Sequence, residues 1–471
     1  MPEGQRPGGL FGGVFARGGC VTDDAAWLQA LLDAEAGLAR ALEKAGLAPP
    51  EAGAEVTAAA RGENFDAAEL GGLSALTGNP VPGLARALAR RVGGMAGRTV
   101  HRGATSQDIM DTAVVLLARR AIDATSADLG AAADAAARLA VDHRTTLMIG
   151  RTLLQQAVPV TFGLVAAEWL NGLSEARARL TEVRQRRLAV QFGGAAGTLA
   201  SLGAHGPRVA GLLATELDLS VPVLPWHTQR QRILDIATAM AGATAALAKI
   251  ARDVTLLSQS EIAEVSEGAG EQGPQGAPRR GGSSAMPNKR NPVASIAILG
   301  CARQVPGLVA TILACAEQEE QRAAGGWHAE WQPLGHLFTL TVSAAAWGAE
   351  LLGGLAVDTS RMAANLAATE GLPLAEHVTA LLAGVLGGPE AHDLVAEAGE
   401  RAVASGLPLG DVLLSVPELE QRLSQAGITA DQIEAALEPA GYLGAAESFI
   451  DAALAEHAAL SEHESTGGNR G

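Results

Sequence analysis

One short segment of the chain gathers several side chains that suit the stabilisation of a negative charge. Residues 282–292 have the sequence Gly-Ser-Ser-Ala-Met-Pro-Asn-Lys-Arg-Asn-Pro and follow a glycine-rich stretch. Lys289 supplies a positive charge and Asn291 a carboxamide donor, which together with backbone N–H groups can hold an oxyanion. Ser283 can act as a base only if that field strongly lowers the pKa of its hydroxyl. A capped helix start after a polar loop is the alternative explanation of the same pattern.

Two further polar clusters interrupt apolar surroundings upstream of this segment. Residues 101–108 (His-Arg-Gly-Ala-Thr-Ser-Gln-Asp) precede a helical pattern over 109–118, so their hydroxyls and the helix N-terminus can bind a carboxylate. Residues 150–156 (Gly-Arg-Thr-Leu-Leu-Gln-Gln) place a cation, a hydroxyl and two amides before Pro159. Either cluster alone is typical of a helix cap or a loop. Three clusters, all rich in anion donors and far apart in the sequence, are less readily explained as caps or loops.

The composition indicates a helical protein and argues against several classes of function. Of 471 residues, 48% are hydrophobic but only 3% are aromatic, which suits closely packed helices better than a β-sandwich. The net charge of −16 argues against nucleic-acid and membrane partners, because an acidic surface repels phosphate backbones and anionic lipid. The three cysteines are too few and too scattered for a disulfide framework or a zinc site. Without a signal-peptide pattern or a run of about 18 apolar residues, we expect a cytoplasmic protein with no membrane-spanning helix.

The spacing of prolines and apolar residues predicts the long helices that must position these clusters. Proline is absent from four windows rich in good helix formers: 83–158, 160–206, 226–273 and 334–372. In the third window, apolar residues recur at steps of three and four, as in a helix packed in a bundle: Ile233, Ile236, Met240, Ala243, Leu247, Ile250, Val254 and Leu257. Another helix is predicted to begin at 22–24, where Thr-Asp-Asp supplies capping side chains. The glycine-rich stretch 267–282 is expected to be a mobile loop that closes over substrate.

Residues 282–292 match the signature loop Gly-Ser-Ser-x-Met-Pro-x-Lys-x-Asn-Pro, so the chain resembles the fumarase/aspartase superfamily. The other two clusters lie upstream in the order expected for this superfamily, and the resemblance covers nearly the whole chain. Within the superfamily the chain is most similar to the 3-carboxy-cis,cis-muconate cycloisomerase branch. Weaker matches to this branch occur at 10–15, 101–113, 150–163, 225–230, 327–331 and 442–444.

The resemblance implies an all-α subunit with three domains and a central long-helix bundle. We expect an N-terminal helical domain over 1–110, the bundle domain over 111–357, a small helical C-terminal domain over 358–460 and a disordered tail over 461–471. The resemblance further implies a homotetramer in which each active site is shared between subunits. No metal or organic cofactor is implied.

The resemblance also assigns roles in making or breaking a bond β to a carboxylate. Ser283 is implied to be the base that takes the α proton, while Lys289 and Asn291 stabilise the resulting aci-carboxylate. The residues implied to bind or surround a small polycarboxylate substrate come from all three clusters: His101, Thr105, Ser106, Arg151, Thr152, Gln155, Gln156, Ser284, Met286 and Arg290.

Three departures from the family pattern concern the general acid. Many members carry a histidine directly after the threonine of the second cluster, where this chain has Leu153, and some cycloisomerases carry it where this chain has Gln156. In the signature loop, Asn288 occupies a position often held by histidine in this branch. A leaving group that needs little protonation tolerates this loss, which favours conversion of 3-carboxy-cis,cis-muconate to a carboxymuconolactone. A fumarate-releasing nitrosuccinate lyase is the close alternative, an adenylosuccinate lyase a more distant one, and a catalytically silent structural oligomer an alternative of another class.

Overall fold

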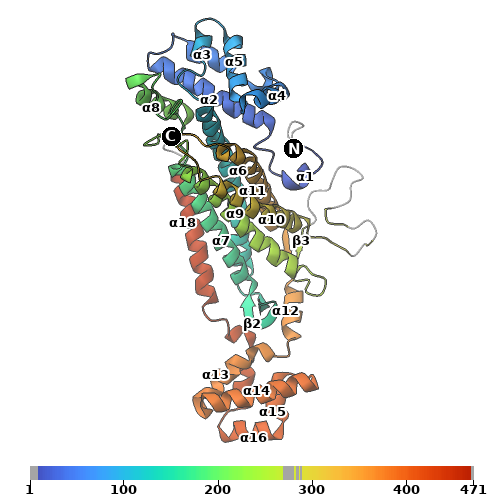
Figure 1. Ribbon diagram of the computed structural model, residues 1–471. Coiled ribbons are helices and arrows are strands. Elements are labelled where there is room, and N and C mark those ends of the chain that lie inside the picture. The colour runs from blue at the N-terminus through green and yellow to red at the C-terminus, as the bar shows by residue number, and fades with distance from the viewer. Residues whose placement is uncertain (1–8, 269–279, 283–285, 287–288, 468–471) are drawn as a thin grey trace. The chain divides into compact units, whose positions relative to one another are not determined.

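The protein is described by a computed structural model that covers residues 9–268, 280–282, 286 and 289–467 (Figure 1). The chain is 69% helical, and the described part contains eighteen α-helices, which confirms the predicted all-α class. Two short antiparallel strand pairs, which the sequence analysis did not predict, are the exceptions: β1 (Leu147–Thr152) with β2 (Gln155–Thr161), and β3 (Val265–Glu267) with β4 (Leu355–Val357). Most of the predicted lid, residues 269–279, lies outside the described residues.

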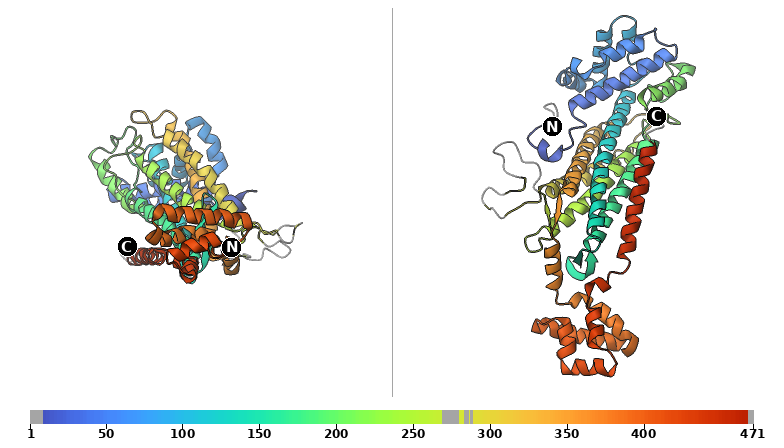
Figure 2. Two further views of the ribbon diagram at one scale, coloured as in Figure 1. Left: turned by 90° about the horizontal axis from the view of Figure 1, so that it is seen from below. Right: turned by 180° about the vertical axis from the view of Figure 1, so that it is seen from behind.

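Long helices form the bundle: α6 (Ser106–Asp142), α7 (Phe162–Arg186), α9 (Gln231–Leu257), α10 (Val293–Ala314) and α11 (Gly326–Gly353). Figure 1 and Figure 2 show α9 and α11 side by side, and Thr244 Oγ1 lies 3.0 Å from Thr341 Oγ1 across their contact. The eight apolar positions predicted for the stripe over 233–257 are all buried, with at most 7% of each residue exposed. The predicted bundle helix is therefore confirmed, because steps of three and four place these side chains on one face.

The described chain divides into two compact units. The first comprises Met1–Gly130, Glu175–Ala251 and Ala294–Glu350, and the second comprises Ala131–Ser174, Arg252–Val293 and Leu351–Gly471. Because the boundaries fall inside α6, α7, α9, α10 and α11, each of these helices contributes to both units. The division into three domains at residues 110 and 357 stays a prediction.

The first unit also contains the N-terminal helices. Helix α2 (Asp24–Lys44) begins as predicted, because the Asp23 carboxylate caps it by accepting a 2.8 Å hydrogen bond from Ala26 N. Helix α8 (Gly206–Leu217) packs closely against α2, and a Cβ added at Gly37 would lie 2.8 Å from the Leu217 side chain. The bounds of the remaining helices are α1 (Gly12–Phe15), α3 (Ala52–Ala59), α4 (Ala67–Thr77) and α5 (Val81–Val92).

The second unit contains the short helices that follow β4. They are α12 (Thr359–Ala367), α13 (Ala375–Leu386), α14 (Gly388–Ser405), α15 (Leu409–Ser415), α16 (Pro417–Gln425) and α17 (Ala430–Ala436). Helices α13 to α17 enclose a hydrophobic core of their own, with Leu382, Leu394 and Leu413 fully buried. The last helix, α18 (Ala446–Gly467), continues beyond residue 460, where the disordered tail was expected to begin.

Among the described residues, helices α9 and α10 are long and apolar enough to cross a membrane, judged by length and composition alone. Their most apolar windows have mean hydropathies of 1.5 and 1.7. Half of that window is buried in α9, in keeping with its bundle packing, but only 28% is buried in α10. On α10, Ile296 and Leu313 are 53% and 60% exposed. Helix α10 therefore presents an apolar face that the described part of a single chain leaves uncovered. The expected absence of a membrane-spanning helix stays a prediction.

Candidate active site

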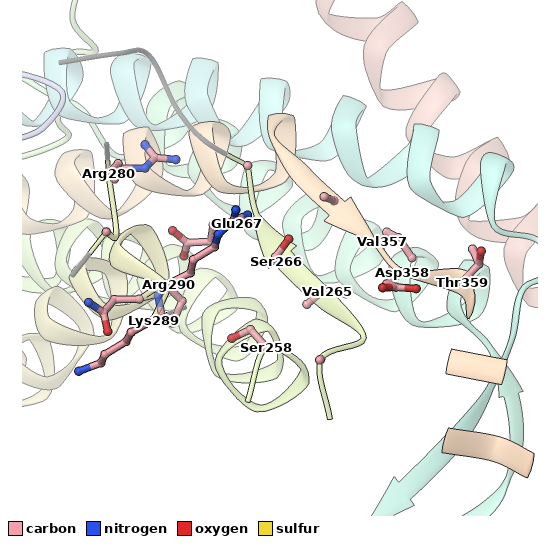
Figure 3. Close-up of a pocket in the computed structure, with 16 residues that line it drawn as sticks. Ser258, Val265, Ser266, Glu267, Arg280, Lys289, Arg290, Val357, Asp358 and Thr359 are labelled. Atoms are coloured by element: carbon pink, nitrogen blue, oxygen red, sulfur yellow. The ribbon is translucent and has the colours of Figure 1, made fainter. Parts of the chain in front are cut away.

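A cavity of about 640 Å³ lies in the second unit beside the signature segment (Figure 3). Strands β3 and β4 form one part of its wall, and the residues that flank 283–288 form another. Figure 3 shows Arg280, Lys289 and Arg290 on one side of the cavity and Val357, Asp358 and Thr359 on the other. Asn291 also lines the cavity. Three predicted site residues, Lys289, Arg290 and Asn291, therefore lie around one cavity.

The charges around this cavity favour an anionic ligand. Three cationic side chains line it, those of Arg280, Lys289 and Arg290, against the two carboxylates of Glu267 and Asp358. Asp358 Oδ1 also accepts a 2.8 Å hydrogen bond from Arg361 N and so caps the start of α12. The remaining excess of positive charge suits a polycarboxylate, because a cleft focuses the field of the charges that line it.

The two ends of the signature segment are held together by backbone contacts. Asn291 N donates to Gly281 O at 2.8 Å, and Gly282 pairs with Arg290 in an isolated antiparallel bridge. Gly281 has φ +80°, and a Cβ there would lie 2.4 Å from Asn291 O, so the closure requires glycine at this position. The backbone thus brings Gly282, the residue before Ser283, next to Arg290.

The predicted roles of the signature-segment side chains stay predictions, and two of these residues, Ser283 and Ser284, are not described by the structure. Ser283, Ser284 and Asn288 lie outside the described residues, so the assignment of Ser283 as the base stays a prediction. Of the other members, Met286 is 48% exposed, and its carbonyl oxygen accepts a 3.1 Å hydrogen bond from Lys289 N.

The second predicted cluster forms the β1–β2 hairpin. Across it, Arg151 pairs with Gln156 and Thr152 with Gln155, so these four predicted residues lie together. The two-residue turn consists of Leu153 and Leu154, which have φ values of 51° and 65° and are 96% and 71% exposed. Positive φ at both turn residues is the backbone geometry that matches the twist of a tight hairpin. Leu153, which replaces the histidine of many family members, therefore lies exposed at the hairpin tip.

Arg151 connects this hairpin to the cavity wall. Its guanidinium donates two hydrogen bonds to the Glu264 carboxylate, at 2.9 Å and 2.7 Å, and Glu264 is fully buried. Asn365 Nδ2 donates to the same carboxylate at 2.7 Å. Glu264 lies between Ala263 and Val265, and both of these line the cavity. The sequence assigned Arg151 to substrate alone, whereas the structure also gives it a buried carboxylate partner.

The first predicted cluster belongs to the first unit and surrounds the N-terminus of α6. Thr105 and Ser106 are half-buried there, and their hydroxyls carry no hydrogen bond to the described residues. Thr105 N donates to Asp108 Oδ2 at 2.9 Å. His101 precedes this start in the left-handed region, with φ 61°, and its Nδ1 lies 2.7 Å from Glu35 Oε1. Hydroxyls at the start of a 37-residue helix are suited to bind a carboxylate.

Comparison with known proteins gives a consistent answer. A family model described as lyase matches residues 21–307. The 3-carboxy-cis,cis-muconate cycloisomerase of Bradyrhizobium diazoefficiens is 46% identical over 435 residues, which cover 92% of this chain and 94% of that protein. The nitrosuccinate lyase of Streptomyces davaonensis is 43% identical over 442 residues, which cover 92% of this chain and 90% of that protein. The crystal structure of 3-carboxy-cis,cis-muconate lactonizing enzyme from Pseudomonas putida matches with a TM-score of 0.87 and 40% identity, over 96% of this chain and 99% of that one.

The chain belongs to the fumarase/aspartase family of lyases. The family predicted from the signature loop is thereby confirmed, as is the prediction that the chain is an enzyme of the lyase and cycloisomerase type. Within the described part of this lyase, no group of three or more His, Cys, Asp or Glu side chains is arranged to hold a metal ion.

A buried pair that was not predicted positions the α6 cluster of the lyase. His227 Nε2 lies 2.7 Å from Asp108 Oδ1, and both side chains are at most 4% exposed. Asp108 also accepts hydrogen bonds of 2.9 Å from Gly193 N and Gly194 N. With the bond from Thr105 N, the Asp108 carboxylate fixes the α6 start to two distant chain segments. The weaker family match at 225–230 was the sequence signal for His227.

A second buried network lies one turn further along α6. The Arg230 guanidinium contacts both Asp111 (2.8 Å) and Glu330 (2.6 Å), and all three side chains are 1% exposed. Trp327 Nε1 donates to Asp111 Oδ1 at 3.1 Å. Burial, aided by the nearby Asp111 charge and opposed by Arg230, raises the pKa of Glu330 to about 7. One guanidinium shared by two buried carboxylates leaves a negative charge that favours retention of a proton.

Proposed function

We propose that this lyase interconverts 3-carboxy-cis,cis-muconate and a carboxymuconolactone. The observation that carries the proposal is the 46% identity, over 92% of the chain, to a cycloisomerase of that substrate from Bradyrhizobium diazoefficiens. The cationic cavity beside the signature segment supports it, because Lys289, Arg290 and Arg280 suit a substrate with several carboxylates.

The proposed reaction adds one carboxylate of the substrate to its own double bond. In the lactonising direction a carboxylate oxygen bonds to the carbon β to another carboxylate, and the α carbon gains a proton. In the opposite direction Ser283 takes the α proton, and Lys289 and Asn291 stabilise the charge that moves onto the aci-carboxylate. The C–O bond of the lactone then breaks, and its electron pair leaves with the carboxylate. This leaving group needs little protonation, which is consistent with Leu153 and Gln156 where relatives carry an acid.

The remaining predicted residues are proposed to bind the substrate carboxylates. Hydroxyls at the α6 N-terminus and polar side chains of the hairpin supply donors: Thr105, Ser106, Thr152, Gln155 and Gln156. The proposed surroundings of the substrate also include His101, Arg151, Ser284, Met286 and Arg290. No metal, organic cofactor, nucleic acid or membrane takes part in the proposed reaction, and the proposed compartment is the cytoplasm.

We propose that the working enzyme is a homotetramer whose active sites are shared between subunits. The apolar face of α10 supports this, because only 28% of its most apolar window is buried in a single chain. Large exposed apolar patches usually mark an interaction site.

A second candidate is elimination of nitrite from nitrosuccinate to give fumarate. It is favoured by the 43% identity to the Streptomyces davaonensis lyase over the same share of the chain. Nitrite also leaves without strong protonation, so Leu153 fits this reaction equally well.

Steady-state assays with both substrates, followed by ultraviolet absorbance, separate the two candidates. We expect turnover of 3-carboxy-cis,cis-muconate. Turnover of nitrosuccinate alone would favour the second candidate, and turnover of neither would reject both. Ser283→Ala is expected to keep the oligomer intact and to lower turnover by about 10²–10⁴-fold. The matched Ser405→Ala on α14 removes a hydroxyl that donates to Arg401 O and is expected to leave turnover unchanged. Unchanged turnover of Ser283→Ala would remove Ser283 from the mechanism.

A further inference from the structure

Glu35 on α2 makes a pair of hydrogen bonds with a single residue of the predicted site. Its Oε2 accepts from His101 N at 3.0 Å, and its Oε1 lies 2.7 Å from His101 Nδ1. The Glu35 side chain is 0% exposed. The family resemblance implies that His101 binds substrate but gives Glu35 no role. Both bonds of this buried carboxylate go to His101.

The position of Glu35 on its helix is unusual for a charged residue. It falls in the apolar stripe of α2, between Leu31 and Leu38, which are at most 4% exposed. A carboxylate buried among apolar side chains is costly unless a cation or several donors compensate it. His101 supplies both a backbone N–H and, when protonated, a positive ring. The pair thus accounts for a glutamate where the helix pattern requires an apolar residue.

Glu35 also acts on the charge of the imidazole. Burial alone lowers the pKa of His101, but the hydrogen bond and charge of Glu35, together with the charge of Asp108, raise it above its ordinary value. These two carboxylates, from α2 and α6, are the charged groups that act on His101 in the described chain. The Asp108 carboxylate is hydrogen-bonded to Thr105 N and lies against His227, so it raises the pKa of His101 through its charge and not through a direct contact. Glu35 is the one in direct contact.

The geometry leaves one ring nitrogen for a ligand. With Nδ1 engaged by Glu35, the other polar atom of the ring is Nε2, which has no hydrogen-bond partner among the described residues. The His101 side chain is 26% exposed; Thr105 immediately precedes α6, and Ser106 is the first residue of that helix. An imidazolium with one N–H held by a carboxylate presents the other as a fixed, charge-assisted donor.

We propose that Glu35 is a positioning residue: it fixes the His101 ring through Nδ1 and keeps it protonated, so that Nε2–H binds a substrate carboxylate next to Thr105 and Ser106. This inference rests on the proposed function, because it takes a polycarboxylate as the ligand. It assigns a specific task to a residue that lies outside every family motif in this chain.

Glu35→Gln tests the proposal, because glutamine keeps the size and an acceptor for Nδ1–H but removes the charge. We expect the KM for 3-carboxy-cis,cis-muconate to rise about tenfold, since a charge-assisted hydrogen bond is replaced by a neutral one, while kcat changes little. Binding requires the protonated ring, so KM rises as pH increases through the pKa of His101. Without the Glu35 charge that pKa is lower, and the rise in KM is expected to begin at a lower pH.

A matched control is Glu43→Gln on the same helix. The Glu43 carboxylate also accepts two hydrogen bonds, from Glu51 N and Gly53 N, but neither involves a predicted site residue. Glu43→Gln is expected to leave KM and its pH profile unchanged. A Glu35→Gln variant that lowers kcat at unchanged KM and pH profile would overturn the proposal.

The double variant decides whether Glu35 acts through His101. In the His101→Gln background, Glu35→Gln is expected to raise KM no further, because the ring on which the carboxylate acts is gone. Equal effects of Glu35→Gln in both backgrounds would contradict the proposal.

A titration without substrate separates this inference from the proposed function. With histidine-selective carbon labelling, the His101 resonance is assigned by its loss in His101→Gln and followed against pH. We expect it to titrate above the ordinary value of about 6.5 in the wild-type enzyme. Titration at or below that value would overturn the proposal even if Glu35→Gln failed to fold. If the enzyme turned over neither substrate, the proposed function would fail while this titration still decided the role of Glu35.

Discussion

The guanidinium of Arg151 is paired through two hydrogen bonds with the fully buried carboxylate of Glu264, which belongs to the wall of the cationic cavity. Arg151 is itself only 20% exposed. The pair joins the hairpin that carries Thr152 and Gln155 to the strand that follows α9. The position of these polar side chains therefore depends on an ion pair that also stabilises the second unit.

Arg151→Met is expected to destabilise the protein by about 3 kcal/mol, because it leaves the Glu264 charge buried with Asn365 as its remaining described partner. The double variant Arg151→Met/Glu264→Gln is expected to recover part of this loss. The midpoint of denaturant unfolding measures both effects. Arg144→Met is the control, since its partner Asp451 is 65% exposed and exposed ion pairs contribute little. Equal midpoint shifts for Arg151→Met and Arg144→Met would contradict the prediction.

Local sequence patterns predicted those parts of the fold that neighbours along the chain determine. The stripe over 233–257 is buried at every predicted position, because a period near 3.5 residues can be satisfied only by one face of a helix. The start of α2 followed from Asp23, whose side chain needs only Ala26 N nearby. The signature loop predicted the family, because eight fixed residue types within eleven positions rarely match by chance.

The buried partners of the predicted site residues could not be predicted in this way. His101 and Glu35 are 66 residues apart, Arg151 and Glu264 are 113 apart, and Asp108 and His227 are 119 apart. Spacing along the chain says nothing about which distant carboxylate meets which cation once the helices pack. The usable signals were a charged residue inside an apolar stripe, as at Glu35, and the weaker family match at 225–230 that contains His227. The hairpin was missed because Leu153 and Leu154 lack the Asn-Gly type of turn residues.

Glu330 is expected to make stability depend on pH. Burial raises its pKa to about 7 in the folded protein, above the value in the unfolded chain. The stabilising contribution of the protonated group is therefore complete below about pH 4.3 and is lost as pH rises to about 7. Glu330→Gln removes this dependence, so the variant is expected to gain up to about 4 kcal/mol relative to the wild type across that range.

Thermal midpoints of both proteins between pH 4 and pH 8 measure this gain. Glu319→Gln serves as the control, because the Glu319 carboxylate is exposed and a hydrogen bond from Ala324 N lowers its pKa instead. Parallel midpoint curves for the wild type and Glu330→Gln would show that Glu330 titrates as in the unfolded chain.

Gly281→Ala is expected to reduce turnover without a large loss of stability. Its Cβ would lie 2.4 Å from Asn291 O at a φ of +80°, so the backbone must shift and displace Asn291 from the cavity wall. A displacement of about 1 Å at a reacting site costs on the order of 10²-fold in rate. Gly211→Ala in α8, where nothing lies within 4 Å of a new Cβ, is the control for the added methyl group. Steady-state kinetics on both variants test this, and wild-type turnover of Gly281→Ala would contradict it.

The uncovered face of α10 is expected to be buried between subunits. Ile296→Lys and Leu313→Lys place a charge on that face, whose wild-type side chains are 53% and 60% exposed in the single chain. In the proposed tetramer each charge would be buried without a partner, which costs several kcal/mol per subunit, and the assembly is expected to dissociate. Leu76→Lys on α4, where the leucine is 82% exposed, is expected to leave the assembly intact.

Light scattering in the absence of detergent measures the mass of each variant. Because each active site in the proposal is shared between subunits, turnover is expected to fall together with the tetramer in Ile296→Lys and to persist in Leu76→Lys. A wild-type protein that required detergent to remain in solution would instead indicate that the α10 face contacts lipid. A tetramer that survived both lysine substitutions on α10 would place the subunit interface elsewhere. The exposed apolar face of α10 would then have to be covered by a different binding partner.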